Sequence, residues 1–211
     1  MKKGTCRKSP RAIHEHLAKT LKDFGDIPVD KKSPWLKKRG SKGGYMVQDS
    51  VYCQKAQKDL DLASQKADGD LKQFLTEKAK SYKSYYEALF KEWHIYDASG
   101  IGLGEACQKY VDILNHTAQK EEPIYLLVAS IPCARLWPWI GQQITQGEPK
   151  SGCYTEWIAE NFDPKSDGYL KYEARVNAAY QLGKLDWCKA VDIYKKCMTG
   201  EADFFASAED K

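Results

Sequence analysis

Helical spacing of the apolar residues is the feature that most constrains the fold of this 211-residue chain. In segments 45–63 and 71–93, apolar residues recur every three or four positions and fall on one stripe of a helix. We find no alternating apolar and polar pattern of the kind that predicts half-buried strands. Apolar stripes of this length must cover one another when no sheet is available. We therefore predict an all-α bundle of about seven or eight helices.

Glycines and prolines separate the predicted helices. We expect a first helix with apolar residues at 13, 17, 21 and 24, and further helices at 45–63, 71–93, 103–119, 124–144, 154–162, 169–182 and 185–206. Segment 124–144 is the most apolar. Its opening residues also fit a strand, but its length favours a buried helix, in which Pro138 is expected to introduce a kink.

Composition is that of a globular protein. With 42% hydrophobic and 12% aromatic residues, the chain can bury a substantial core, so we expect one domain over residues 1–211, with a divergent basic segment at 1–44. No stretch reaches the roughly 20 apolar residues of a membrane span. Four of the first eight residues are basic, and the segment lacks the apolar core of a signal peptide. We expect a soluble, cytoplasmic protein that does not enter a membrane.

Charge is unevenly distributed along the sequence. Residues 1–42 hold 13 of the 33 Lys and Arg residues and 4 of the 29 Asp and Glu residues, which leaves 20 basic and 25 acidic residues in the remainder. The basic segment lacks interleaved aromatics and any nucleic-acid-binding module. We therefore interpret it as a solvated lysine-rich surface and expect no nucleic-acid partner.

The cysteine and histidine patterns do not predict a metal site. The seven cysteines are odd in number and include no Cys-x-x-Cys pair, which indicates reduced thiols rather than disulfides or zinc ligands. His14 and His16 lie two residues apart, on opposite sides of a predicted helix, without a cluster of further ligands.

Cys133 is the candidate nucleophile. It follows a long apolar run, and Trp137 lies four residues later, so on a helix the indole covers the same surface as the thiol. Such an aromatic wall suits a flat heteroaromatic ligand. Taken alone, a buried cysteine is more often an inert packing residue.

Two carboxylates and three tyrosines complete the candidate set. Asp49 interrupts an apolar stripe that it shares with Tyr52, and a carboxylate on a buried face needs a partner, either a ligand or a structural hydrogen bond. Glu201 lies near the end of the last predicted helix, where composition alone favours an exposed acid. Tyr110 and Tyr154 are individually more typical of core or rim aromatics. Together, these residues form an inventory for acid/base-assisted nucleophilic chemistry.

Five separated motifs carry a family resemblance. They are Tyr45-Met46-Val47-Gln48-Asp49-Ser50-Val51-Tyr52, Tyr110 at 23 residues before Cys133, Pro132-Cys133 with Ile140-Gly141, Tyr154-Thr155-Glu156-Trp157-Ile158, and Glu201 with Phe204-Phe205. In this order they resemble the TenA family, the thiaminase II group of the haem-oxygenase-like all-α fold. The resemblance covers most of the chain from Tyr45 onward.

The resemblance implies a cysteine-dependent hydrolase of thiamine salvage. Asp49 is expected to bind the aminopyrimidine edge of the ligand, Cys133 to add to its ring and Glu201 to move protons. Tyr52, Tyr110 and Tyr154 are expected to stack on or orient the ring, with Trp137 in the same wall. The implied substrate is aminomethylpyrimidine or thiamine, with no metal or organic cofactor, and the implied assembly is a homo-oligomer, either a tetramer or a dimer.

Two departures from the family pattern leave other functions open. Trp137 stands where the family commonly has tyrosine, so a hydroxyl is replaced by a donor-only indole, and the region before Asp49 is shorter and more basic. One alternative is a non-catalytic binder of thiamine-related or other flat heterocycles. Another is an adaptor whose basic segment binds an acidic partner.

Overall fold

The computed structural model describes residues 39–92, 94–145, 163 and 165–207, and within them the chain is all-helical. The helices are α3 (Arg39–Lys66), α4 (Gly69–Glu92), α5 (Glu105–Lys120), α6 (Pro123–Thr145), α8 (Leu170–Gln181) and α9 (Trp187–Ala206). The all-α prediction is confirmed, and five of these helices lie within two residues of predicted ones. α3 begins six residues before the predicted start at residue 45 and ends three residues after the predicted end. The helices expected near residues 13–24 and 154–162 lie outside the described residues.

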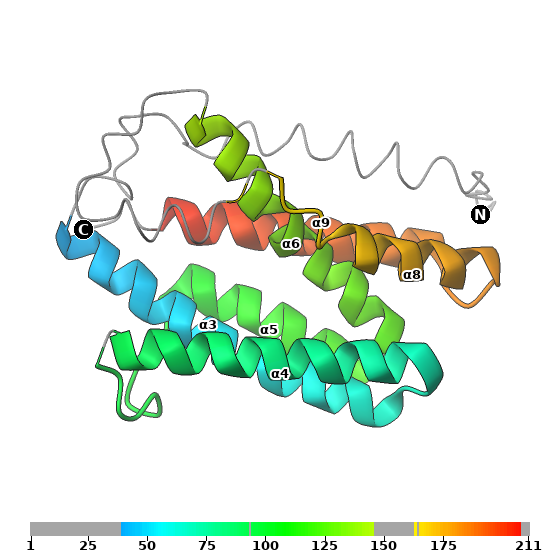
Figure 1. The fold of residues 1–211 in the computed structure, drawn as a ribbon, viewed down its shortest axis with the longest axis horizontal. Helices are drawn as coiled ribbons and strands as arrows, with labels where there is room; N and C mark the ends of the chain where they lie inside the picture. The colour runs from blue at the N-terminus through cyan, green and yellow to red at the C-terminus, as the bar shows by residue number, and fades with distance from the viewer. Residues whose placement is uncertain (1–38, 93, 146–162, 164, 208–211) are drawn as a thin grey trace, which may run out of the picture.

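The helices pack in two groups, α3 with α4 and α5, and α6 with α8 and α9 (Figure 1). α3 lies against α4 and α5, while α9 contacts both α5 and α6. α6 crosses obliquely over α9 and also packs on α8 (Figure 1). In α5, the buried residues Cys107, Tyr110, Val111, Leu114 and Ala118 have the spacing of one helical face, and this face lies against the core.

α6 is the central core helix. Residues 123 to 129 are all buried, and the helix continues through Pro132 and Pro138. Among the described helices, its segment Pro123–Gln142 alone is long and apolar enough to span a membrane, but 78% of the tested window is buried inside the protein. That degree of burial is typical of the core helix of a soluble protein.

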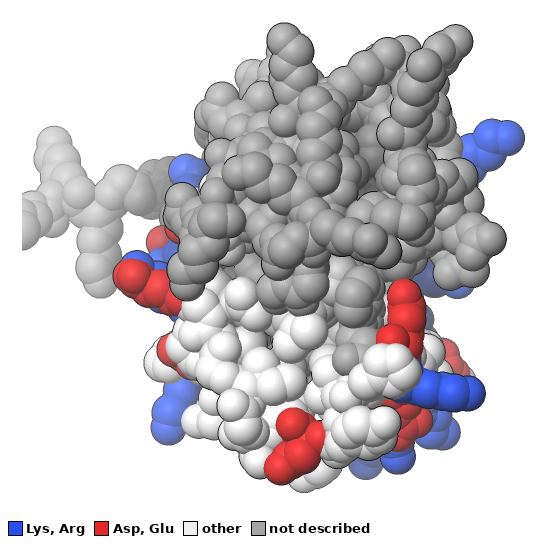
Figure 2. All heavy atoms as spheres, turned by 90° about the vertical axis from the view of Figure 1, so that its left-hand side faces the viewer, with Lys and Arg blue, Asp and Glu red and all other residues white. Residues whose placement is uncertain are grey.

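The described surface on one side of the molecule carries charges of both signs. In the face shown in Figure 2, scattered Lys, Arg, Asp and Glu side chains surround a largely uncharged area. The described part of this face therefore has no concentration of basic side chains of the kind that binds a phosphate backbone.

Candidate functional site

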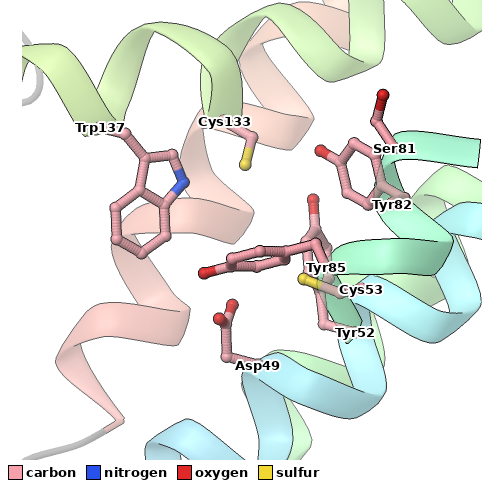
Figure 3. A pocket seen from close by; sticks show the side chains of 8 residues that line it. All are labelled: Asp49, Tyr52, Cys53, Ser81, Tyr82, Tyr85, Cys133 and Trp137. Atoms are coloured by element: carbon pink, nitrogen blue, oxygen red, sulfur yellow. The ribbon is translucent and has the colours of Figure 1, made fainter. Parts of the chain in front are cut away.

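One cavity lies where α3, α4 and α6 face one another (Figure 3). Its volume is about 250 Å³, which is close to the lower end of ligand-binding pockets in proteins. The lining residues are Asp49, Tyr52 and Cys53 of α3, Ser81, Tyr82 and Tyr85 of α4, and Cys133 and Trp137 of α6.

The cavity has a buried inner end and a more exposed outer end. The three α3 residues and Cys133 are buried, whereas Tyr82, Tyr85 and Trp137 are half-buried and Ser81 is exposed. The thiol and a carboxylate thus lie at the protected end. The outer end is lined mainly by aromatic rings, which bury flat apolar surface and carry one polar edge each.

Asp49 carries a buried carboxyl group at the inner end of the cavity. Its side chain points into the cavity (Figure 3) and is 4% exposed. Its Oδ2 atom has no hydrogen-bond partner among the described residues. Because a buried polar atom without a partner is costly, this oxygen is suited to receive a ligand group.

A chain of hydroxyl groups connects α3 to α9 behind the cavity wall. The hydroxyl of Tyr52 lies 3.4 Å from that of Tyr110, and the Tyr110 hydroxyl donates to Oε1 of Glu201 at 2.7 Å. The two rings are stacked with centroids 5.2 Å apart. The surface position favoured for Glu201 by composition alone is wrong, because this residue is 3% exposed.

Gly200 makes the close approach of Tyr110 possible. A Cβ atom at this position would lie 2.6 Å from Cδ2 of the Tyr110 ring, which is closer than non-bonded carbon atoms come. The missing side chain therefore lets α5 pack near enough to α9 for the Tyr110 hydroxyl to reach Glu201.

The Cys133 thiol lies between donors and an acid. The indole of Trp137 and the hydroxyl of Tyr52 lie near the sulfur atom, and the Glu201 carboxyl group lies near enough for its pKa to be affected by the thiol. Burial, reinforced by the nearby Glu201 charge, raises the pKa of the thiol well above its ordinary value, and Trp137 and Tyr52 oppose that rise. Cys133 is therefore a protonated thiol at neutral pH, and it needs a base to become a nucleophile.

Both carboxyl groups titrate near neutrality. Burial and the Glu201 charge raise the pKa of Asp49 to about 7. Burial also raises the pKa of Glu201 to about 7, while the hydrogen bond from Tyr110 and the nearby Cys133 thiol oppose the rise. A carboxyl group with this pKa exchanges protons readily at neutral pH, as a general acid or base must.

Aromatic side chains hold Trp137 against the last helix. Its ring meets that of Phe205 edge-on at 6.1 Å, and Phe205 in turn lies 5.2 Å from Tyr45 of α3. Phe204 stacks on Tyr45 at 4.8 Å. The Phe204-Phe205 motif thus supports the wall that carries the indole.

The structure brings together six of the seven candidate residues. Asp49, Tyr52, Cys133 and Trp137 line the cavity, and Tyr110 and Glu201 join it through hydrogen bonds. Tyr154 lies outside the described residues. In the described part of the chain, no group of three or more His, Cys, Asp or Glu side chains is arranged to hold a metal ion.

Sequence reasoning missed the contribution of α4 and the second thiol, Cys53. The spacing placed Tyr82 and Cys53 on core stripes but gave neither a role at the site, and Tyr85 was not singled out. The only signal was a pair of tyrosines three residues apart, on a helix that already had an apolar face.

The described part of the chain is an all-α bundle that brings a thiol, two carboxyl groups and several phenols together at or directly behind one cavity. The match to a family model fits this arrangement. The model of the TENA/THI-4/PQQC family matches residues 50–210, and the chain belongs to that family. A search of curated proteins found no match to the sequence.

Solved structures support the fold. A TenA homologue from Pyrococcus furiosus has a TM-score of 0.73 at 16% identity, covering 92% of this chain and 98% of its own. A TenA homologue from P. horikoshii OT3 has a TM-score of 0.68 at 21% identity, with 93% and 96% covered. A protein described as a TenA family transcription regulator, from Silicibacter sp. TM1040, has a TM-score of 0.66 at 18% identity, with 90% and 96% covered.

Proposed function

We propose that this protein is a cysteine-dependent hydrolase that converts aminomethylpyrimidine, or thiamine itself, into hydroxymethylpyrimidine for thiamine salvage. Membership of the TENA/THI-4/PQQC family supports a thiamine-related role. The observation that carries the catalytic part is the position of Cys133, which lines the cavity beside Tyr52 and lies close enough to the Glu201 carboxyl group to affect its pKa. We further propose that the protein works in the cytoplasm as a homo-oligomer, without a nucleic-acid or membrane partner.

Asp49 is proposed to bind the aminopyrimidine edge. That edge presents an amino N–H donor beside a ring nitrogen acceptor, and a protonated carboxyl group offers the matching acceptor and donor. The unpaired Oδ2 atom and the pKa of about 7 both suit this pairing. Tyr52 and the aromatic outer end then fix the plane of the ring.

The proposed reaction divides one displacement into two smaller steps. Glu201 takes the proton of the Cys133 thiol as the sulfur adds to the ring, and it then protonates the departing amine, which leaves the exocyclic methylene group as ammonia. Water adds to that methylene group and gives one proton to Glu201. Glu201 returns this proton to the sulfur atom as the carbon–sulfur bond breaks, so the thiol is regenerated. With aminomethylpyrimidine, the net reaction consumes one water and releases one ammonia.

Ammonia release from aminomethylpyrimidine tests the proposal. We expect turnover by the wild type, and a loss of about 10³-fold or more in Cys133→Ala and in Glu201→Gln, with both variants still folded in a thermal unfolding measurement. Cys188→Ala is the matched control, because Cys188 is an exposed thiol at the start of α9. Turnover by Cys133→Ala at the wild-type rate would overturn the nucleophile assignment.

A non-catalytic binder is the second candidate, and the high pKa of the Cys133 thiol is the observation that favours it. A thiol that stays protonated also serves as a polar contact in a binding pocket. Under this alternative, hydroxymethylpyrimidine binds to the wild type, and neither aminomethylpyrimidine nor thiamine is hydrolysed. Calorimetric titration alongside the ammonia assay separates the two functions.

A further inference from the structure

A buried ion pair lies behind the turn of α6 that carries the site. Arg135 follows Cys133 by two residues and precedes Trp137 by two, so it projects from the opposite side of the helix. Nε of Arg135 donates to Oε1 of Glu173 in α8. The two residues are 8% and 5% exposed, and together they connect the back of this turn to a neighbouring helix.

Two aromatic residues surround the ion pair. The Arg135 guanidinium lies over the ring of Tyr169, 4.7 Å from its centroid, at the residue that precedes α8. Tyr194 of α9 is 1% exposed, and the charges of Arg135 and Glu173 both act on its hydroxyl group. The contacts of Arg135 with Glu173 and Tyr169 thus connect α6 to α8 and to the residue that precedes it.

The backbone of α6 is weakened on both sides of this turn. Pro132 and Pro138 have no N–H group, so each removes one hydrogen bond to the carbonyl four residues earlier. The thiol and the indole are therefore carried by a turn whose own hydrogen bonding is incomplete. Contacts from other helices must contribute to its orientation.

Stability alone does not account for a charged pair at this position. Taking two charges out of water is so costly that well-packed apolar residues often serve stability equally well or better. We propose that Arg135 and Glu173 are positioning residues, which set the direction in which Cys133 and Trp137 enter the cavity. The proposal rests on the proposed function in one respect, because it takes Cys133 as the reactive group of the site.

The test measures two properties of each variant, which are its stability and the reactivity of the Cys133 thiol. The variants are Glu173→Gln, the double change of Arg135→Met with Glu173→Met, and Arg135→Lys. Arg175→Met is the matched control. Arg175 lies on α8, as Glu173 does, and it pairs with the largely exposed Asp70. Thermal unfolding gives stability, and mass spectrometry of each cysteine peptide gives the pH profile of Cys133 alkylation without requiring turnover.

We expect Glu173→Gln to unfold at a lower temperature, because it leaves Arg135 buried without its anion. The double variant is expected to recover most of the wild-type unfolding temperature. Its Cys133 alkylation rate is nevertheless expected to differ from the wild type by about tenfold or more, because a small misplacement of a reactive group has a large effect. Arg135→Lys, which keeps the charge, is expected to lie closer to the wild type, and Arg175→Met to match it.

A stable double variant with the wild-type alkylation profile overturns the proposal and leaves the pair a structural role only. If the double variant does not fold, Glu173→Gln decides, and a wild-type profile in that variant also overturns the proposal. Failure of the hydrolase proposal appears separately, as absence of ammonia release from the wild type.

Discussion

At the scale of single residues, the site contains two buried carboxyl groups. Asp49 and Glu201 both have a pKa of about 7, well above that of an exposed carboxyl group. In each case burial is the largest cause. The protein thereby keeps protons available at neutral pH, where the Cys133 thiol needs a partner for proton transfer.

This burial has a consequence for stability that Asp49→Asn tests. The folded protein binds the Asp49 proton more tightly than the unfolded chain does, so the stability this proton contributes is present below about pH 4 and is lost as pH rises to about 7. The substituted asparagine cannot ionise. The free energy of unfolding of the ligand-free Asp49→Asn variant should therefore increase relative to that of the wild type as pH rises, by at most about 4 kcal/mol. Urea unfolding at pH 4, 6 and 8 measures the difference, and a difference that is constant with pH would contradict the account.

At the scale of helices, α4 supplies the outer end of the cavity. Tyr85 lines the cavity, whereas the neighbouring Tyr86 packs on Phe90 at 5.2 Å and does not line it. Removing the Tyr85 ring enlarges a cavity of about 250 Å³ on its open side. The size of the ring substituent that the cavity accepts is therefore expected to depend on α4.

Tyr85→Ala is expected to raise the ratio of thiamine to aminomethylpyrimidine turnover, because the larger ligand gains the space that the ring vacates. Competition kinetics with both substrates gives this ratio directly. Tyr85→Phe keeps the ring and is expected to leave the ratio nearly unchanged, and Tyr86→Ala serves as the control on the same helix. An unchanged ratio in Tyr85→Ala would show that α4 does not limit the size of the ring substituent that the cavity accepts.

The contact between α5 and α9 depends on Gly200. In Gly200→Ala the added methyl group meets the Tyr110 ring, so the helices must separate or the ring must shift. We expect a loss of about 1–3 kcal/mol in stability and reduced turnover, because the bond from Tyr110 to Glu201 is displaced. Chemical denaturation measures the first effect. Thr199→Ala, at an exposed neighbouring position, should stay within about 0.5 kcal/mol of the wild type, and equal effects in both variants would count against this contact.

At the scale of the whole molecule, the sequence was sufficient for the helices but not for every wall of the cavity. Helical periodicity predicted the six described helices, because their buried stripes are continuous and glycines or prolines separate them. It could not show that Tyr82 and Tyr85 lie opposite Cys133, because that depends on how α4 and α6 pack across α3. Glu201 was similarly ambiguous, since its burial results from contact between α9 and α5.

The two groups of helices meet at the candidate site, and its residues therefore come from helices of both groups. α3 provides Asp49 and Tyr52, α6 provides Cys133 and Trp137, and α9 provides Glu201 behind them. No single helix contains the complete set. A bundle of this kind holds the groups at fixed distances, because each is anchored by core packing on its own helix.

A crystal structure of the Glu201→Gln variant with aminomethylpyrimidine tests the central claim most directly. The account predicts that the amino edge of the ring pairs with Asp49, and that a ring carbon lies within van der Waals contact of the Cys133 sulfur atom. A ligand bound elsewhere, or one held in this cavity with the Asp49 oxygen still unpaired and the sulfur atom out of reach of the ring, would contradict it.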